Sequence, residues 1–297
     1  MIISASRRTD IPAFFSEWFM KRIEEGFVCV ANPVNPRQVG RFSLLPDDVD
    51  AIVFWSKNPR PLMARLNELD SGYRYYFQFT LNDYPPVFEP NVPGLGERLD
   101  TFRTLSDRVG PDRVVWRYDP IVVSSVTPPD YHLERIDGIA SSLRGYTRRL
   151  VISLLDFYSK TEGRLSRLSS ETGTMFRDIA LPAYRTELLA LARRIRGIGD
   201  GHGLEVSSCA EAVDLGDAGI PHGACIDAAL IRRLFGIEKD FPKDRGQRAE
   251  CLCAESVDVG AYNTCGHQCA YCYANFSGES ITKNLARHDA SSPVLIG

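Results

Sequence analysis

Residues 2–31 read IISASRRTDIPAFFSEWFMKRIEEGFVCVA, and the prediction of the fold starts from this stretch. Two apolar, β-rich runs at 2–6 and 27–31 flank a segment whose apolar residues recur at helical spacing. Pro12 suits the start of a helix, and Gly26 suits its end. The stretch therefore predicts a strand, a helix and a second strand.

The same alternation continues along the chain. We predict eight strands, at 2–6, 27–31, 51–55, 75–81, 113–118, 150–155, 204–208 and 256–262. The segment 32–46 shows no helical period and is a candidate hairpin. Strands that alternate with helices over 297 residues favour an α/β fold, a (β/α)8 or closely related barrel, over an open doubly wound sheet. We expect one barrel domain, residues 1–297, whose cysteine-rich C-terminal part spans 205–276.

Composition and charge restrict the class of protein. Hydrophobic residues make up 44% and charged residues 25%, as in ordinary globular proteins. A net charge of -3 offers no overall attraction for phosphates, so nucleic acid would need a local basic patch. No apolar run approaches the roughly 18 residues of a membrane span. Arg7 and Arg8 follow the first apolar run, whereas a signal peptide places its positive charges before it. We expect a cytoplasmic protein without a membrane partner.

Polar side chains gather where the predicted strands end, which is where barrels place their catalytic groups. The candidates are Arg7, Arg8 and Asp10 after the first strand, Lys57 after the third, Arg117, Tyr118 and Asp119 at the fifth, and Asp156 after the sixth. We expect the cationic side chains to bind a carboxylate or phosphate, and Tyr118, Asp119 and Asp156 to orient the reacting group. The alternative for Asp10 is that it caps the helix entered at Pro12.

The strongest motif is residues 263–275, NTCGHQCAYCYAN, in which Cys265, Cys269 and Cys272 have the spacing C-x3-C-x2-C. In a reducing compartment clustered thiols indicate metal or redox chemistry rather than disulfides. A four-iron cluster takes four thiolates, so three from one loop leave one iron open to another ligand. The alternative is a zinc knuckle in which His267 joins the three cysteines.

Five further cysteines lie outside this motif. Cys29 stands within an apolar run, and we interpret it as a small buried hydrophobic residue. Cys209, Cys225, Cys251 and Cys253 flank loops, and four thiolates would complete a second iron–sulfur cluster. A structural zinc uses the same ligands, and C-x-C spacing distinguishes the two poorly. Free or mixed thiols are the third possibility.

The cysteine motif, with Tyr271 just before its third cysteine, resembles that of the radical S-adenosylmethionine superfamily. Around Cys272 it is similar to the spore photoproduct lyase branch of that superfamily. There the open iron of a [4Fe–4S] cluster binds S-adenosylmethionine, and one electron cleaves this cofactor to a 5'-deoxyadenosyl radical. The resemblance implies such a cluster on Cys265, Cys269 and Cys272, a cofactor contact from Tyr271, and an electron donor such as flavodoxin or ferredoxin.

Over nearly its whole length the chain resembles a bacterial family called domain of unknown function 1848, a name that carries no activity. The motifs are IISASRRTDIP at 2–12, WSKNP at 55–59, WRYDP at 116–120 and YCYAN at 271–275. In the radical S-adenosylmethionine superfamily the cysteines normally follow the first barrel strand, whereas here they lie near the end of the sequence. This difference implies a circular permutation, in which the strand at 256–262 precedes the cysteines, a helix at 281–287 follows, and the strand at 2–6 comes next.

The permuted order also assigns cofactor contacts by position. Ser6, Arg7, Arg8 and Asp10 would then contact S-adenosylmethionine, with Lys57 and Arg117 beside them, although the glycine-glycine-glutamate motif of the superfamily is missing. The leading hypothesis is a radical S-adenosylmethionine enzyme with an auxiliary iron–sulfur cluster, acting on an unidentified small molecule. The alternatives are repair of a nucleic-acid lesion by the same chemistry, and a non-catalytic zinc or iron–sulfur protein.

Overall fold

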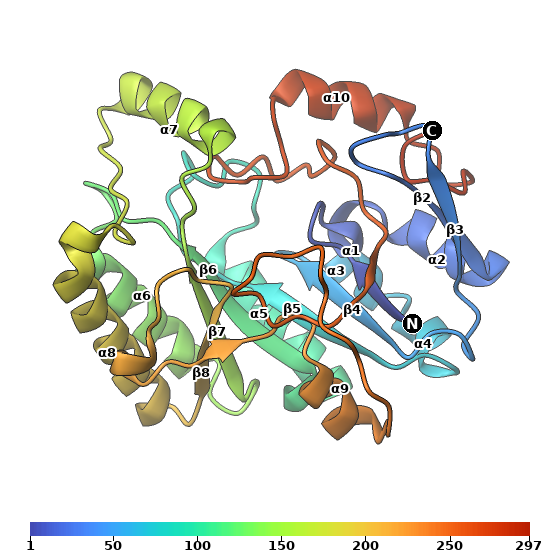
Figure 1. The fold of residues 1–297 in the computed structure, drawn as a ribbon, viewed down its shortest axis with the longest axis horizontal. Coiled ribbons are helices and arrows are strands. Elements are labelled where there is room, and N and C mark those ends of the chain that lie inside the picture. Colours follow the sequence, from blue (N-terminus) through green and yellow to red (C-terminus); the bar gives the residue numbers. More distant parts are fainter.

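A curled parallel sheet organises the chain in the computed structural model, which describes residues 1–297 and every side chain except those of Ser159 and Lys160. Its strands are β1 (Ile2–Ala5), β4 (Ala51–Ser56), β5 (Tyr75–Thr80), β6 (Val114–Ile121), β7 (Arg149–Leu154), β8 (Glu205–Cys209), β9 (His222–Gly223) and β10 (Val257–Asp258). The spatial order is β10-β1-β4-β5-β6-β7-β8-β9, and all neighbours run parallel (Figure 1).

The sheet is open. Its order begins with β10 and ends with β9, and in the described part of the chain these two strands do not pair with each other. The expected barrel-like α/β fold is therefore confirmed as a half-barrel, without the closed ring of a (β/α)8 barrel. Since parallel strands end at the same edge, the residues that follow them are brought to one side of the sheet.

The strand predicted at 27–31 has a different place from the one expected. It forms β2 (Phe27–Ala31), which pairs antiparallel with β3 (Val39–Ser43) outside the main sheet. The hairpin expected within 32–46 is therefore only partly correct, because that segment supplies the connection and β3, whereas the first strand of the hairpin lies before it. Cys29 is only half-buried there, and its backbone N donates to Pro293 O at 2.8 Å. Placing β2 in the barrel was wrong, because its other neighbour is the C-terminal segment. The main sheet is completed instead by β9. This strand has only two residues, too few for a periodic pattern in the sequence to indicate it.

Helices connect most of the strands. They are α1 (Ile11–Phe14), α2 (Ser16–Glu25), α3 (Arg60–Met63), α4 (Leu66–Asp70), α5 (Leu95–Val109), α6 (Pro129–Ser142), α7 (Ser159–Thr172), α8 (Arg185–Gly201), α9 (Ala228–Phe235) and α10 (Gly278–Arg287). Gly26 ends α2 with a φ of 73°, a conformation that favours glycine. Among the described residues, no helix has both the length and the apolar character needed to cross a membrane.

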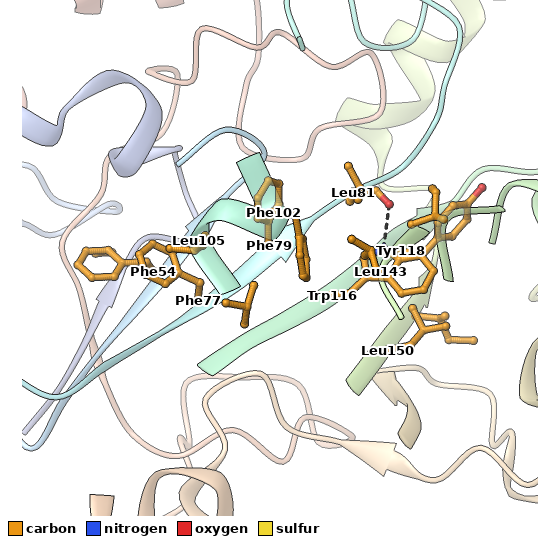
Figure 2. Packing of buried hydrophobic residues seen from close by; sticks show 14 of the residues in the cluster. Phe54, Phe77, Phe79, Leu81, Phe102, Leu105, Trp116, Tyr118, Leu143 and Leu150 are labelled. Atoms are coloured by element: carbon orange, nitrogen blue, oxygen red, sulfur yellow. Dashed lines mark hydrogen bonds between the residues drawn. The ribbon is translucent and has the colours of Figure 1, made fainter. Parts of the chain in front are cut away.

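One face of the sheet packs against helices. Phe54, Phe77 and Phe79 project from neighbouring strands toward Phe102 and Leu105 of α5 (Figure 2). All five side chains are fully buried, and each such burial contributes about 1.5–3 kcal/mol. The dashed line in Figure 2 marks the hydrogen bond from the Trp116 indole to Leu81 O, 2.9 Å long, which satisfies the polar atom of this buried ring.

The opposite face packs against the segment that carries three of the cysteines. Val53, Tyr76 and Val115 contact Cys225 and its neighbours there, so Tyr76 points away from the face that Tyr75 and Phe77 occupy. Successive side chains of β5 thus alternate between the two faces of the sheet, as in any β-strand. This second, smaller core brings the cysteines of residues 225–253 against the sheet.

Candidate metal centres and the polar network between them

The cysteine box, Cys265, Cys269 and Cys272, lies in the loop that follows β10. Positive φ angles at Asn263 (58°) and Gln268 (53°) bend this loop sharply. Cys269 and Cys272 belong to an apolar cluster that includes leucines of α7, and Cys269 is almost fully buried. The thiol of Cys269 therefore faces surroundings from which water is largely excluded, whereas Cys265 and Cys272 are half-buried.

The three thiols of the box lie close enough for their charges to interact. Burial raises the pKa of Cys265 well above its ordinary value, and charge on Cys272 and Cys269 raises it further. Burial also raises the pKa of Cys269 to about 12, although the Lys57 ammonium opposes this shift. Burial and mutual repulsion thus favour the neutral thiols of Cys265 and Cys269, and a bound metal would supply positive charge that stabilises thiolates.

The donor set of the box fits an iron–sulfur cluster. Three thiols from one loop match a cube with one open iron. No three His, Cys, Asp or Glu side chains among those described are arranged to hold a single metal ion.

His267 does not join the three cysteines. Its Nε2 lies 2.9 Å from Asp10 Oδ2 and its Nδ1 lies 3.1 Å from Asn91 O. Both ring nitrogens of His267 are therefore engaged with groups outside the box.

Cys209, Cys225, Cys251 and Cys253, the second cysteine group, meet although they come from distant segments. Hydrogen bonds link the thiol of Cys225 to those of Cys209 and Cys253, and the thiol of Cys253 to that of Cys251. The bond to Cys225 is the main reason why the pKa of Cys209 is lowered to about 7. The fold thus gathers four thiols, the number that a fully ligated cube or a structural zinc requires.

Arg117 of β6 contacts the second cysteine group directly. Its Nη1 donates to Cys225 Sγ at 2.8 Å, and its Nε donates to Asp119 Oδ2 at 2.8 Å. The carbonyl of Cys225 accepts hydrogen bonds from Tyr76 Oη at 2.6 Å and from Gln78 Nε2 at 2.7 Å. Burial lowers the pKa of Arg117, but Asp119 and Cys225 outweigh this effect and keep it raised. The guanidinium is therefore a buried, permanent cation beside these thiols.

Lys57 occupies the corresponding position beside the box. Its Nζ lies 2.8 Å from Glu89 Oε1 and 3.1 Å from Tyr271 Oη, while Asn82 Nδ2 donates to Tyr271 Oη at 3.4 Å. Burial lowers the pKa of Lys57, but the Glu89 carboxylate and charge on Cys269 outweigh it and the pKa is raised. Lys57 thus remains a cation next to the box.

The residues after β1 hold the strand of the box in place. Ser6 Oγ donates to Asp258 Oδ1 at 2.5 Å, and Arg7 N donates to Asp258 Oδ2 at 2.9 Å. The guanidinium of Arg8 lies over the Tyr262 ring, 5.5 Å from its centre. These contacts of Ser6, Arg7 and Arg8 join β1 to β10 and to the segment leading to the box.

Asp10 joins three parts of the site. Its Oδ1 accepts hydrogen bonds from Ala13 N at 3.0 Å and Ser56 Oγ at 2.7 Å. Its Oδ2 accepts from Lys57 N at 2.7 Å and lies 2.9 Å from His267 Nε2. The interpretation of Asp10 as a helix cap is confirmed, and the same carboxylate also ties the end of β4 to the box.

Two predicted site residues lie apart from the others. Tyr118 is fully buried in the helix-facing core beside Trp116, and its hydroxyl lies 3.0 Å from His132 Nδ1 (Figure 2). The side chain of Asp156 is 43% exposed and pairs with Arg248 at 3.1 Å. Strand alternation explains the position of Tyr118, because Arg117 and Asp119 share one face of β6 and the residue between them takes the other.

Several residues of the network were missed in the sequence. They are Tyr76, Gln78, Asn82, Glu89 and Asp258. Asn82 follows β5 and could have been found by the strand-end argument that selected Lys57. Asp258 is an acidic residue within an otherwise apolar run, a pattern that often indicates a buried partner. Glu89 lies in a loop without periodicity, and no local signal indicates it.

Comparison with protein-family models gives a match over most of the chain. The family described as Domain of unknown function (DUF1848) matches residues 2–274. No curated protein matches the chain. The matched range includes both cysteine groups and the polar residues between them.

Proposed function

Because the chain belongs to the DUF1848 family, whose description names no activity, we propose from the geometry of its cysteines that it is a radical S-adenosylmethionine enzyme with a second iron–sulfur cluster. The observation that carries this proposal is the convergence of Cys265, Cys269 and Cys272 in a half-buried loop at the strand-end edge of a curled α/β sheet. A separate set of four thiols meets on one face of the same sheet.

The strand order supports a circular permutation. β10, which precedes the box, pairs in parallel with β1 through Ile3 with Val257 and Ser4 with Asp258. The strand before the box is thus the neighbour of a strand from the opposite end of the sequence, and α10 follows the box. This is the order in space that a radical S-adenosylmethionine fold would keep if its chain began at the second strand.

Cys265, Cys269 and Cys272 would hold a [4Fe–4S] cluster, which when bound and reduced supplies the electron that cleaves S-adenosylmethionine to a 5'-deoxyadenosyl radical. The protein provides the surroundings. Leucines of α7 shield the box from water, and Lys57 offsets negative charge at Cys269. Asp10 holds the loop through His267.

The second cysteine group would hold an auxiliary cluster that passes electrons or places the substrate. A structural zinc held by the same four thiols is the alternative. The cations near the cysteines are buried, with 13% exposure for Lys57 and 3% for Arg117. Buried cations suit a small-molecule substrate better than a nucleic-acid backbone. An electron donor such as flavodoxin or ferredoxin would reduce the clusters.

Metal analysis after anaerobic purification tests the cofactor content. Two cubes predict about eight irons per chain with matching sulfide. Stoichiometric zinc in a colourless protein would contradict the proposal for both cysteine groups.

Replacing Cys269 by alanine tests the role of the box. We expect Cys269→Ala to lose about half of the iron and to abolish the reductive cleavage of S-adenosylmethionine to 5'-deoxyadenosine and methionine, because one of three cluster ligands is removed. The product is measured by chromatography after dithionite reduction. Cys29→Ala, in the β2–β3 hairpin, is the matched control and should keep both iron and cleavage. Cleavage at the wild-type rate by Cys269→Ala would exclude the box as the reaction centre.

A further inference from the structure

We propose that Arg117 is a positioning residue that sets the reduction potential of the second cluster through its hydrogen bond to Cys225. This inference rests on the proposed function, because it requires an iron–sulfur cluster at the second cysteine group. Arg117 is not a cluster ligand, and the four cysteine ligands alone do not determine the reduction potential that we assign to its influence.

The guanidinium is held by contacts on several sides. Nη1 lies 2.8 Å from Cys225 Sγ and 3.5 Å from Gln78 Oε1, and Nε lies 2.8 Å from Asp119 Oδ2. The side chain is only 3% exposed, and it stacks over Trp55 with 5.2 Å to the ring centre. With these partners the group cannot turn away from the sulfur without losing several interactions at once.

Asp119 is anchored in turn to the box. Its backbone N donates to Asn82 Oδ1 at 2.9 Å, and Asn82 Nδ2 donates to Asp119 O at 3.0 Å. The same Nδ2 lies 3.4 Å from Tyr271 Oη. A continuous path of hydrogen bonds therefore runs from Cys225 through Arg117, Asp119 and Asn82 to the tyrosine between Cys269 and Cys272.

A cationic donor at a ligand sulfur favours the reduced cluster. Hydrogen bonds to the sulfurs and nearby charge are among the factors that set cluster potentials. A positive charge stabilises the electron added on reduction, and it acts more strongly where water is excluded. Asp119 partly cancels the charge of Arg117. Removing Arg117 should thus lower the potential, and removing the charge of Asp119 should raise it.

The test is a redox titration of the reconstituted full-length protein, followed by the electron paramagnetic resonance signal of the second cluster. Each protein is titrated both with and without the additional substitution Cys269→Ala. Comparing the two titrations separates the signal of the second cluster from that of the first. We expect Arg117→Gln to make reduction at least tenfold less favourable, equivalent to 59 mV for one electron. Asp119→Asn should shift the midpoint in the opposite direction, and Arg117→Lys should fall between the wild type and Arg117→Gln.

Arg22→Gln is the matched control. Arg22 is fully buried, and its contacts are with Glu25 at 2.9 Å and with the C-terminal segment rather than with either cysteine group. This variant should therefore keep the wild-type midpoint. If Arg117→Gln cannot be loaded with iron, the opposite shifts of Arg117→Lys and Asp119→Asn decide the question.

Two results would overturn the inference in distinguishable ways. Unchanged midpoints in the loaded Arg117 and Asp119 variants would reject the role of Arg117 and leave the proposed function intact. Zinc or no metal at the second cysteine group of the wild type would reject this role together with the auxiliary cluster. In that case, the assay for cleavage of S-adenosylmethionine would still test the proposed role of the box, independently of the second cysteine group.

Discussion

The imidazole of His132 shows how burial determines the charge of a single residue. It is fully buried, with Nδ1 3.0 Å from Tyr118 Oη and Nε2 3.0 Å from Val122 O. Burial lowers the pKa of His132 to about 4, below the usual 6.5. Between these two pH values the unfolded chain binds a proton that the folded chain does not. The contribution of neutral His132 to the free energy of unfolding is thus fully present above pH 6.5 and is lost as the pH falls toward 4.

His132→Gln should reduce this acid sensitivity. Glutamine can contact the same partners but does not titrate, so between pH 7 and pH 4 the variant should lose about 3 kcal/mol less unfolding free energy than the wild type. Urea unfolding at both pH values measures the difference, and carboxylates that titrate in both proteins cancel in the comparison. Parallel losses in the two proteins would contradict the assignment.

At the scale of elements, the two-residue strand β10 depends on close contact with β1. Asp258 accepts hydrogen bonds from Ser4 Oγ at 3.0 Å and Ser6 Oγ at 2.5 Å. A Cβ added at Gly260 would lie 2.1 Å from Ser6 Oγ and 2.6 Å from Ser6 Cβ. Glycine is needed here so that the segment leading to the box can approach the end of β1.

Gly260→Ala should separate β10 from β1. We expect a loss of about 1–3 kcal/mol in unfolding free energy, because the added methyl group overpacks the junction, together with reduced iron at the box. Urea unfolding and iron analysis measure the two effects. Gly138→Ala is the matched control: no atom lies within 4 Å of the added Cβ in α6, so we expect a gain of up to about 1 kcal/mol. Equal effects of the two substitutions would argue against the close approach.

At the scale of the whole molecule, the C-terminal segment binds the N-terminal part of the chain. Figure 1 shows the C terminus and α10 near the β2–β3 hairpin. Three donors from the N-terminal part bind backbone carbonyls of residues 291–293: Trp18 Nε1 to Ser292 O at 2.9 Å, Arg22 Nη2 to Ser291 O at 3.1 Å, and Cys29 N to Pro293 O at 2.8 Å. Leu295 is buried in the same core as Trp18.

Deleting residues 289–297 should therefore destabilise the whole protein. The buried Trp18 and Arg22 side chains would lose acceptors, and an unsatisfied buried donor costs about 1–3 kcal/mol. We expect a loss of more than about 2 kcal/mol in urea unfolding. The double variant Ser291→Ala, Ser292→Ala is the control: it keeps the carbonyl acceptors and should lose much less. A deletion without effect on unfolding would show that the segment contributes no stability.

Much of the fold could be predicted, because a buried strand or an amphipathic helix shows its pattern locally. Seven of the predicted strands correspond to strands of the main sheet, at the places of β1, β4, β5, β6, β7, β8 and β10. The run at 27–31 has equally strong strand character, but the choice between the sheet and a hairpin depends on its partners. The eighth strand of the main sheet is β9, which has only two residues.

The candidate site could be predicted only where its residues are close together in the sequence, because their spacing then indicates a shared site. Cys265, Cys269 and Cys272 are near in sequence, so their loop brings them together. The position of Tyr118, in contrast, depends on which face of β6 meets the helices, and Glu89 reaches Lys57 from a loop without a local pattern.

By itself, the sequence determined the alternation of strands and helices and the division of seven cysteines into three and four, since both depend on residue type and short-range spacing. Only the tertiary structure decided that the sheet stays open, that β10 lies beside β1, and that Arg117 reaches Cys225 while Asp119 holds it in place. These contacts join residues up to 254 positions apart, and they depend on which surfaces meet when the chain packs.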